Sequence, residues 1–181
     1  MVRRRLAVTA ALAAALAGAA PASAGAKGWD DAGSIARDAL VVAALGVPVV
    51  QGDWNGALQA GGSIGATALV TYGLKESVPA WRPDRSDRKS FPSGHTSMAF
   101  SAAATLHNRY GWQVGLPAQI VAAFVGVSRV KADKHHWYDV VVGAAIGEAA
   151  GFLITRRRDD RVRIVPWGDS KSGGVAMAVR F

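Results

Sequence analysis

Five long apolar segments constrain the fold of this chain more than any other feature of its sequence. Four of them contain no charged residue and the last contains only Glu148; they are Ala39–Gly52, Trp54–Leu74, Thr96–Asn108, Tyr110–Ser128 and Val140–Thr155. Each is long enough for a helix of roughly three to five turns, and the short polar connections between them are typical of helical hairpins. The sequence therefore predicts a mainly α fold.

The composition agrees with closely packed helices. The 181 residues include 21 Gly and only 8% aromatic residues, and small side chains let helix backbones approach one another. The chain is half apolar and 19% charged, which excludes a disordered acidic or basic tail. It contains no Cys, so disulfides, thiolate metal sites and cysteine nucleophiles are excluded.

The C-terminal residues follow a different pattern. After the basic run 156–158, apolar residues alternate with other residues in 161–165 and again in 175–181, as in β-strands. The complete fold prediction is a helical bundle of about five to six helices with a small C-terminal β-hairpin. It divides the chain into a signal peptide (1–24), a helical domain (25–160) and a hairpin tail (161–181).

The first 24 residues have the features of a secretory signal. A basic start (Arg3 to Arg5) precedes an apolar stretch (6–20), and the small residues Ala22 and Ala24 flank Ser23, which predicts cleavage after Ala24. An uncleaved membrane anchor is the alternative, although the stretch is short for one. Cleavage would remove three of the 21 basic residues and lower the net charge from +8 to +5, because 18 would remain against 13 acidic residues. That excess suits lipid headgroups or phosphorylated substrates, and no nucleic-acid-binding motif accompanies it.

Location in a membrane is a second expectation. A span needs about 20 apolar residues, and only Trp54–Leu74 and Tyr110–Ser128 approach that length. If the loops near Arg82 and Lys131 face the periplasm, the opposite helix ends carry Arg109 and the run 156–158, which agrees with the positive-inside rule. We expect an exported protein of the cell envelope, embedded in the membrane, with a soluble periplasmic bundle as the alternative.

Three polar clusters stand at the ends of the predicted helices. The first cluster spans residues 75–83 and contains Lys75 and Arg82. The second is Pro-Ser-Gly-His at residues 92–95, and the third spans residues 128–139 and begins with Ser128 and Arg129. Backbone amides of Ser93, Gly94 and His95 at a helix N-terminus would form an anion site, and the three cations would add charged donors suited to phosphate. Arg85, Arg88 and Lys89 are expected to be solvated or to attract anionic substrate.

Two histidines and one carboxylate could perform the chemistry. His135 and Asp139 are four residues apart, so on a helical turn Asp139 can orient one imidazole nitrogen while the other acts as a nucleophile. His95 remains as the general acid for the leaving oxygen. His136 is an alternative nucleophile, only three residues from Asp139.

The spacing Lys-x6-Arg-Pro, Pro-Ser-Gly-His and Ser-Arg-x5-His-x3-Asp, in that order, resembles the type 2 phosphatidic acid phosphatase and vanadium haloperoxidase superfamily, in its bacterial phosphatase branch. The resemblance covers Lys75 to Asp139. It implies a helical bundle in which His135 becomes phosphorylated, Asp139 is its partner and His95 is the acid. It implies as phosphate ligands Lys75, Arg82, Ser93, Gly94 and Arg129, with no metal and no cofactor. The short connection from Pro83 to Pro92 suggests an open site.

The expected function is hydrolysis of a phosphomonoester or diphosphate on a lipid or polyprenyl carrier. Rivals are a soluble periplasmic acid phosphatase acting on small phosphate esters, a vanadate-dependent haloperoxidase, and a noncatalytic envelope protein that binds anionic lipids. The sequence does not select the substrate or the oligomeric state. Vanadate would inhibit a phosphatase and activate a haloperoxidase.

Overall fold

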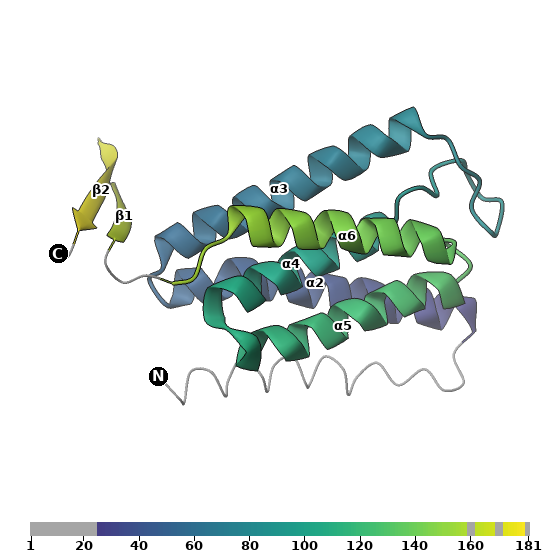
Figure 1. The fold of residues 1–181 in the computed structure, drawn as a ribbon, viewed down its shortest axis with the longest axis horizontal. Coiled ribbons are helices and arrows are strands. Elements are labelled where there is room, and N and C mark those ends of the chain that lie inside the picture. The colour runs from purple at the N-terminus through teal and green to yellow at the C-terminus, as the bar shows by residue number, and fades with distance from the viewer. Residues whose placement is uncertain (1–24, 159–161, 169–171, 180–181) are drawn as a thin grey trace.

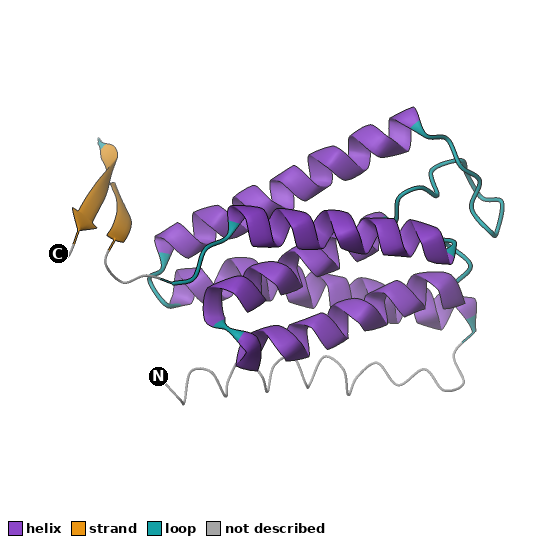
Figure 2. Cartoon of the chain, viewed as in Figure 1, coloured by secondary structure: helices purple, strands orange, loops and turns teal. Residues whose placement is uncertain are grey.

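Helices form most of the structure, a computed structural model that describes residues 25–158, 162–168 and 172–179. Figures 1 and 2 show a helical bundle with a separate β-hairpin. In chain order, the elements are α2 (Ala26–Val50), α3 (Trp54–Ser77), α4 (Gly94–Tyr110), α5 (Trp112–Lys131), α6 (Trp137–Ile154), β1 (Val162–Gly168) and β2 (Gly173–Val179). The strands are antiparallel, with Val162 opposite Val179. The predicted mainly α bundle with a C-terminal hairpin is confirmed, and the predicted signal segment lies outside the described residues.

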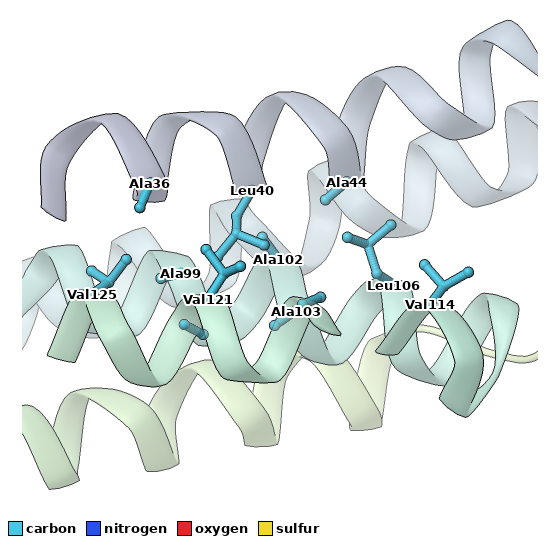
Figure 3. Close-up of a cluster of buried hydrophobic side chains, with 12 residues drawn as sticks. Ala36, Leu40, Ala44, Ala99, Ala102, Ala103, Leu106, Val114, Val121 and Val125 are labelled. Carbon is cyan, nitrogen blue, oxygen red and sulfur yellow. The ribbon is translucent and has the colours of Figure 1, made fainter. Parts of the chain in front are cut away.

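Helix α4 is the central element of the bundle, and α2, α3, α5 and α6 all pack against it. Small side chains make up much of its interface, while larger ones fill the space between α2, α4 and α5 (Figure 3). Leu40 from α2, Leu106 from α4 and Val121 from α5 are fully or almost fully buried there. Alanine-rich surfaces allow the helices to approach closely, as the composition predicted.

Glycines allow α6 to lie directly on the backbone of α4. A Cβ atom on Gly147 would collide with the carbonyl oxygen of Ser97 and would lie 2.6 Å from the amide nitrogen of Ser101. One turn earlier, a Cβ on Gly143 would lie 2.6 Å from the carbonyl oxygen of Ser93. This close contact holds the N-terminus of α6 beside the N-terminus of α4.

Hydroxyl side chains line the contact between α3, α4 and α6. Thr71 donates a hydrogen bond to Ser97 Oγ at 3.0 Å, and both residues are buried. Further along, Thr155 Oγ1 lies 3.1 Å from Ser63 Oγ and donates to Thr105 Oγ1 at 3.3 Å. The interior of this part of the bundle is therefore polar, and these hydroxyls are hydrogen-bonded to one another. The buried hydroxyls of Thr67 and Ser101 have no hydrogen-bond partner among the described residues.

Large apolar side chains lie on the outer surface of the helices. They include Val42 and Val50 on α2, Leu58 and Leu69 on α3, Ile120 on α5, and Val141 and Leu153 on α6. Three helices, α2, α5 and α6, are long and apolar enough to cross a membrane. Such exposed apolar side chains suggest association with lipid, because water-soluble domains rarely expose large apolar patches. The sequence had pointed to the regions of α3 and α5, and of these two only α5 is among the three.

Helix α2 begins at Ala26, well before the predicted start at Ala39. The prediction followed the charge-free stretch, but a helix can carry charges on the face that is not packed. In the first half of α2, the buried positions are Ala32, Gly33 and Ala36. The charged residues of this half-helix consequently lie away from the core, and some of them reach the polar end of the bundle.

The motif residues gather at that end of the bundle. The long connection from α3 to α4, the turn from α5 to α6 and the first residues of α2 all lie there, while the hairpin lies at the other end (Figure 1). The antiparallel order of the helices explains this, since segments far apart in sequence return to the same end. At the hairpin end, Arg109 forms a buried ion pair with Asp53.

Candidate active site

His135 and Asp139 lie together where α5 turns into α6. His135 is 3% exposed and Asp139 is fully buried. The Nδ1 atom of His135 lies 3.7 Å from Asp139 Oδ2, which is close enough for electrostatic orientation but longer than a hydrogen bond. Within the described part of the chain, neither His135 Nδ1 nor Asp139 Oδ1 has a hydrogen-bond partner. His135 and Asp139 therefore lie close together, as their four-residue spacing predicted, but without a hydrogen bond between them.

His136 is also close to the same carboxylate. Its Nδ1 lies 3.3 Å from Asp139 Oδ2, and its backbone amide donates to that oxygen at 2.9 Å, which caps the first turn of α6. Its ring is about one-third exposed and stacks on Tyr138 with 4.9 Å between ring centroids. This arrangement fits a capping residue, while His135 is buried among the motif cations.

Ser90 is a site residue that the motifs did not indicate. It is fully buried, and its hydroxyl donates to Asp139 Oδ2 at 2.5 Å. A charge-assisted hydrogen bond of this length helps fix the carboxylate. Ser90 stands in the loop before Pro-Ser-Gly-His, where nothing in the sequence distinguishes it from neighbouring surface residues.

Arg82 faces the other nitrogen of His135. Its NH1 atom lies 3.4 Å from His135 Nε2 and donates to the carbonyl oxygen of Lys134 at 3.2 Å, while its Nε donates to Asp87 at 2.7 Å. A guanidinium has no acceptor, so Nε2 of His135 presents its lone pair to Arg82. Burial, then the positive charges of Arg82 and Lys75, lowers the pKa of His135. The ring is therefore neutral at neutral pH.

Lys75 connects the end of α3 to the loop before α4. Its Nζ donates to the carbonyl oxygens of Lys89 at 2.8 Å and Pro92 at 2.6 Å. A Cβ on Gly94 would lie 3.7 Å from Lys75 Cε, so the ammonium chain runs beside the start of α4. Burial, followed by the charge of Arg82, lowers the pKa of Lys75 to about 8.

Fewer backbone amides are available to an anion at the start of α4 than the sequence predicted. The backbone amide of Ser93 donates to the carbonyl oxygen of Asp139 at 3.0 Å, and the Ser93 hydroxyl lies 2.9 Å from Thr96 Oγ1. Ser93 therefore joins α4 to α6, because its amide already has an acceptor. The first-turn amides of Gly94 and His95, which have no acceptor within a helix, remain suited to an anion.

Arg129 is 2% exposed and pairs with the carboxylate of Asp30 on α2. Its NH1 also donates to the Asp30 carbonyl oxygen at 3.4 Å, and its Nε has no hydrogen-bond partner among the described residues. An unpaired buried guanidinium donor is costly, and a phosphate oxygen would satisfy it. No motif in the sequence indicated that α2 would supply a carboxylate here.

His95 lies against α2 as well. Its Nε2 is 3.0 Å from Arg37 NH1 and 3.2 Å from Ser34 Oγ. Burial, then the charges of Arg129 and Arg37, lowers the pKa of His95 to about 4. The two groups of motif residues meet at the start of α4, where Gly94 adjoins Lys75 and the next residue, His95, adjoins Arg37.

All eight predicted site residues therefore lie at one end of the bundle. His135, Asp139, Arg82 and Lys75 form one group, and His95 and Arg129 form a second group that shares residues of α2. The residues that the motifs did not indicate are Ser90, Asp30, Ser34 and Arg37.

Comparison with known proteins finds relatives for the part of the chain that carries two of the three motifs. Residues 84–163 match the profile of the PAP2 superfamily, which spans the Pro-Ser-Gly-His and Ser-Arg-x5-His-x3-Asp motifs. Over these residues the chain is similar to members of this superfamily.

Two bacterial relatives are named for lipid A. The chain is 40% identical over 83 residues to lipid A 1-phosphatase of Porphyromonas gingivalis, which covers 44% of this chain and 18% of the relative. It is 35% identical over 102 residues to lipid A 4'-phosphatase of Helicobacter pylori, covering 50% of this chain and 52% of the relative.

A plant relative, lipid phosphate phosphatase 2 of Arabidopsis thaliana, is 39% identical over 128 residues, covering 47% of this chain and 44% of the relative. The matches therefore span about half or less of these relatives' lengths. No solved structure matches the chain.

Proposed function

We propose that this protein is an exported, metal-independent phosphatase that hydrolyses a phosphomonoester or diphosphate of a lipid or polyprenyl carrier through a phosphohistidine intermediate. The observation that carries the proposal is the environment of His135. Its neutral ring has Asp139 on the Nδ1 side and Arg82 on the Nε2 side. A nucleophile oriented by a carboxylate and facing a phosphate-binding cation suits phosphoryl transfer.

In the first step, His135 Nε2 attacks phosphorus and the bond from phosphorus to the leaving oxygen breaks. Asp139 stabilises the positive charge that develops on the imidazole. His95, protonated at that moment, gives its proton to the leaving oxygen. Arg82, Lys75, Arg129 and the first-turn amides of α4 would neutralise charge on the non-bridging oxygens.

In the second step, water attacks phosphorus, and the bond between phosphorus and His135 breaks. His95, now neutral, accepts the proton from that water, so phosphate leaves and both histidines return to their starting states. Ser90, through its hydrogen bond to Asp139, would hold the carboxylate in place during both steps.

A lipid substrate is favoured by the surface of the bundle. The apolar outer faces of α2, α5 and α6 suit a membrane, and the polar end would then lie at the level of headgroups. Exposed Trp81 and Trp137, from the loop and from the start of α6, are at this end and suit such an interface. The relatives' names, lipid A phosphatase and lipid phosphate phosphatase, support the same substrate class.

A trapping experiment tests the nucleophile. Full-length protein in detergent is mixed with a ³²P-labelled lipid phosphate, quenched within milliseconds at alkaline pH and digested, since phosphohistidine is acid-labile. We expect label on His135, no turnover in His135→Ala, and at least a tenth of the normal rate in His136→Ala. Label on His136 or on a serine would refute the assignment.

Vanadate separates this proposal from its nearest rival. A phosphatase with this site should lose activity when vanadate occupies the phosphate position, and should show no halide oxidation with peroxide. Appearance of peroxide-dependent halide oxidation would favour the haloperoxidase. Absence of phosphate release from every lipid and small ester tested, with lipid binding intact, would favour the noncatalytic envelope protein.

A further inference from the structure

Helix α2 presents a polar face to the site. Asp30, Ser34 and Arg37 are spaced by four and three residues, which places them on one side of the helix. Asp30 pairs with Arg129, while Ser34 and Arg37 contact His95. None of the three belongs to the spaced motifs, and all three precede the residues matched by the superfamily profile.

A tight helix contact holds this face in position. A Cβ on Gly33 would collide with Ser128 Oγ and would lie 3.5 Å from Arg129 NH1, so α2 lies directly against the end of α5. Arg37 is 27% exposed in its side chain and also pairs with Asp38 at 2.7 Å. Its side chain is therefore only partly buried, whereas that of Arg129 is almost fully buried.

The contact between Arg37 and His95 determines where the imidazole proton lies. A guanidinium donates hydrogen bonds and does not accept them, so the nitrogen 3.0 Å from Arg37 NH1 must be the acceptor. That nitrogen is Nε2, and the proton of the neutral ring is consequently on Nδ1. In its acid form, His95 would carry protons on both nitrogens, which this contact does not permit.

The charged groups around His95 come from two helices. Arg37, Asp30 and Asp38 belong to α2, and Arg129 belongs to α5. The two arginines disfavour the imidazolium and the two carboxylates favour it. Arg37 is the one of these cations that contacts the ring, and it is less buried than Arg129.

We propose that Arg37 is a positioning residue for His95. In the substrate-free protein it holds the imidazole neutral with its proton on Nδ1, and on substrate binding it moves to the phosphate, so that His95 can be protonated. A phosphate oxygen is a stronger acceptor for a guanidinium than an imidazole nitrogen, which provides the driving force. Binding of phosphate would thereby be coupled to protonation of His95. Only the role of His95 as the acid rests on the proposed function.

The first test does not depend on activity. Full-length protein labelled with ¹⁵N-histidine is studied by NMR in detergent micelles, and the His95 signals among the four histidines are assigned by their loss in His95→Gln. We expect an unprotonated Nε2 and a protonated Nδ1 in the wild type. In Arg37→Gln, the titration midpoint of His95 should rise by about one pH unit, because a neighbouring positive charge is lost.

Matched variants make this test specific. Arg37→Lys keeps the charge and should keep the low midpoint, and Lys27→Gln, an exposed basic residue on the same helix, should change nothing. Unchanged signals from His107, at the other end of α4, would show that the fold is intact. A protonated Nε2 in the wild type, or an unchanged midpoint in Arg37→Gln, would overturn the proposal.

Inorganic phosphate tests the movement of Arg37. Saturating phosphate should raise the His95 midpoint more in the wild type than in Arg37→Gln, because only the wild type also loses the Arg37 contact. An equal rise in both would refute transfer of Arg37 to phosphate.

The pH profile of kcat/KM provides the catalytic readout. The alkaline limb, which reports the essential acid, should move to higher pH in Arg37→Gln and stay in place in Arg37→Lys. A rise in KM without movement of this limb would show that Arg37 is only a phosphate ligand and would refute the positioning role. If the wild type and all variants lacked phosphatase activity while the NMR results were as expected, the proposed function would be refuted. The contact between Arg37 and His95 would remain supported.

Discussion

Arg129 and Arg85 illustrate how two arginines near one site can differ in role. Arg129 is buried, and its Nε has no hydrogen-bond partner in the described structure, whereas Arg85 is exposed on the loop between α3 and α4. We predict that Arg129→Ala lowers kcat by about a hundredfold or more, because preorganised donors act on charge that develops in the transition state. Arg85→Ala should mainly raise KM, and more so at low salt.

Steady-state kinetics on a lipid phosphate at two ionic strengths would measure both effects. Arg129→Lys serves as the variant that keeps the charge and disturbs Asp30 less. Our division of the basic residues would be wrong if Arg85→Ala lowered kcat as severely as Arg129→Ala.

The two site histidines, His95 and His135, also affect stability. His95 stays neutral in the folded protein down to about pH 4, and His135 likewise has a lowered pKa, whereas an unfolded histidine takes up a proton near pH 6.5. Between these values the unfolded chain binds more protons, so stability must fall as the pH decreases. We predict that Tm in detergent declines from pH 6.5 to pH 4. His95→Gln should reduce the slope, and a flat profile in the wild type would contradict this account.

At the scale of elements, the sequence identified the helices better than their ends. The cores of α3, α4 and α5 follow charge-free stretches, and that of α6 follows a stretch whose one charged residue is Glu148. Helix α2, however, begins at Ala26, thirteen residues before its predicted start at Ala39. A charge-free criterion excludes a half-helix whose charges face the site. For the same reason Ser34 and Arg37 were missed, because a contact between α2 and α4 leaves no spacing signal in a single chain.

Close packing of α6 on α4 leads to a prediction about glycine. Gly147→Ala would drive a methyl group into the Ser97 carbonyl oxygen, so the helices must separate. We expect a loss of about 1–3 kcal/mol in stability, typical of overpacking, together with lower activity, because α6 carries Asp139. Gly65→Ala on α3, where no described atom lies within 4 Å, is the control and should be neutral or slightly stabilising.

Thermal unfolding of both variants in the same detergent would measure the difference. Equal Tm values for Gly147→Ala and Gly65→Ala would show that α4 and α6 do not approach as closely as described.

For the whole molecule, we predict an envelope enzyme that needs no metal. Carbonate-washed membranes should retain the protein, because α2, α5 and α6 are apolar enough to span a bilayer. A non-permeant phosphate ester should be hydrolysed by intact cells, and activity should survive excess chelator. Recovery of active protein in osmotic-shock fluid would favour a soluble periplasmic phosphatase, while loss of activity with chelator would refute the mechanism.

At this scale, the sequence predicted the bundle, the hairpin and the clustering of eight motif residues at one end. Those follow from helix lengths and from the antiparallel return of the chain. Of the helices that are long and apolar enough to span a membrane, it indicated α5 but not α2 or α6, and it indicated α3 wrongly. Hydropathy along a segment does not tell which face is covered, and α3 places Ser63, Thr67 and Thr71 inward while Leu58 and Leu69 point outward.

The hydroxyl-lined contact between α3, α4 and α6 reverses the usual distribution of side chains in a protein. Interior positions there are small and polar, and exterior positions are large and apolar. In such a bundle, exclusion of water cannot be what holds the three helices together. Close packing and hydrogen bonds between hydroxyls hold them instead, so substitutions at Ser97 or Thr105 should be tolerated only where the new side chain keeps both the volume and the hydroxyl.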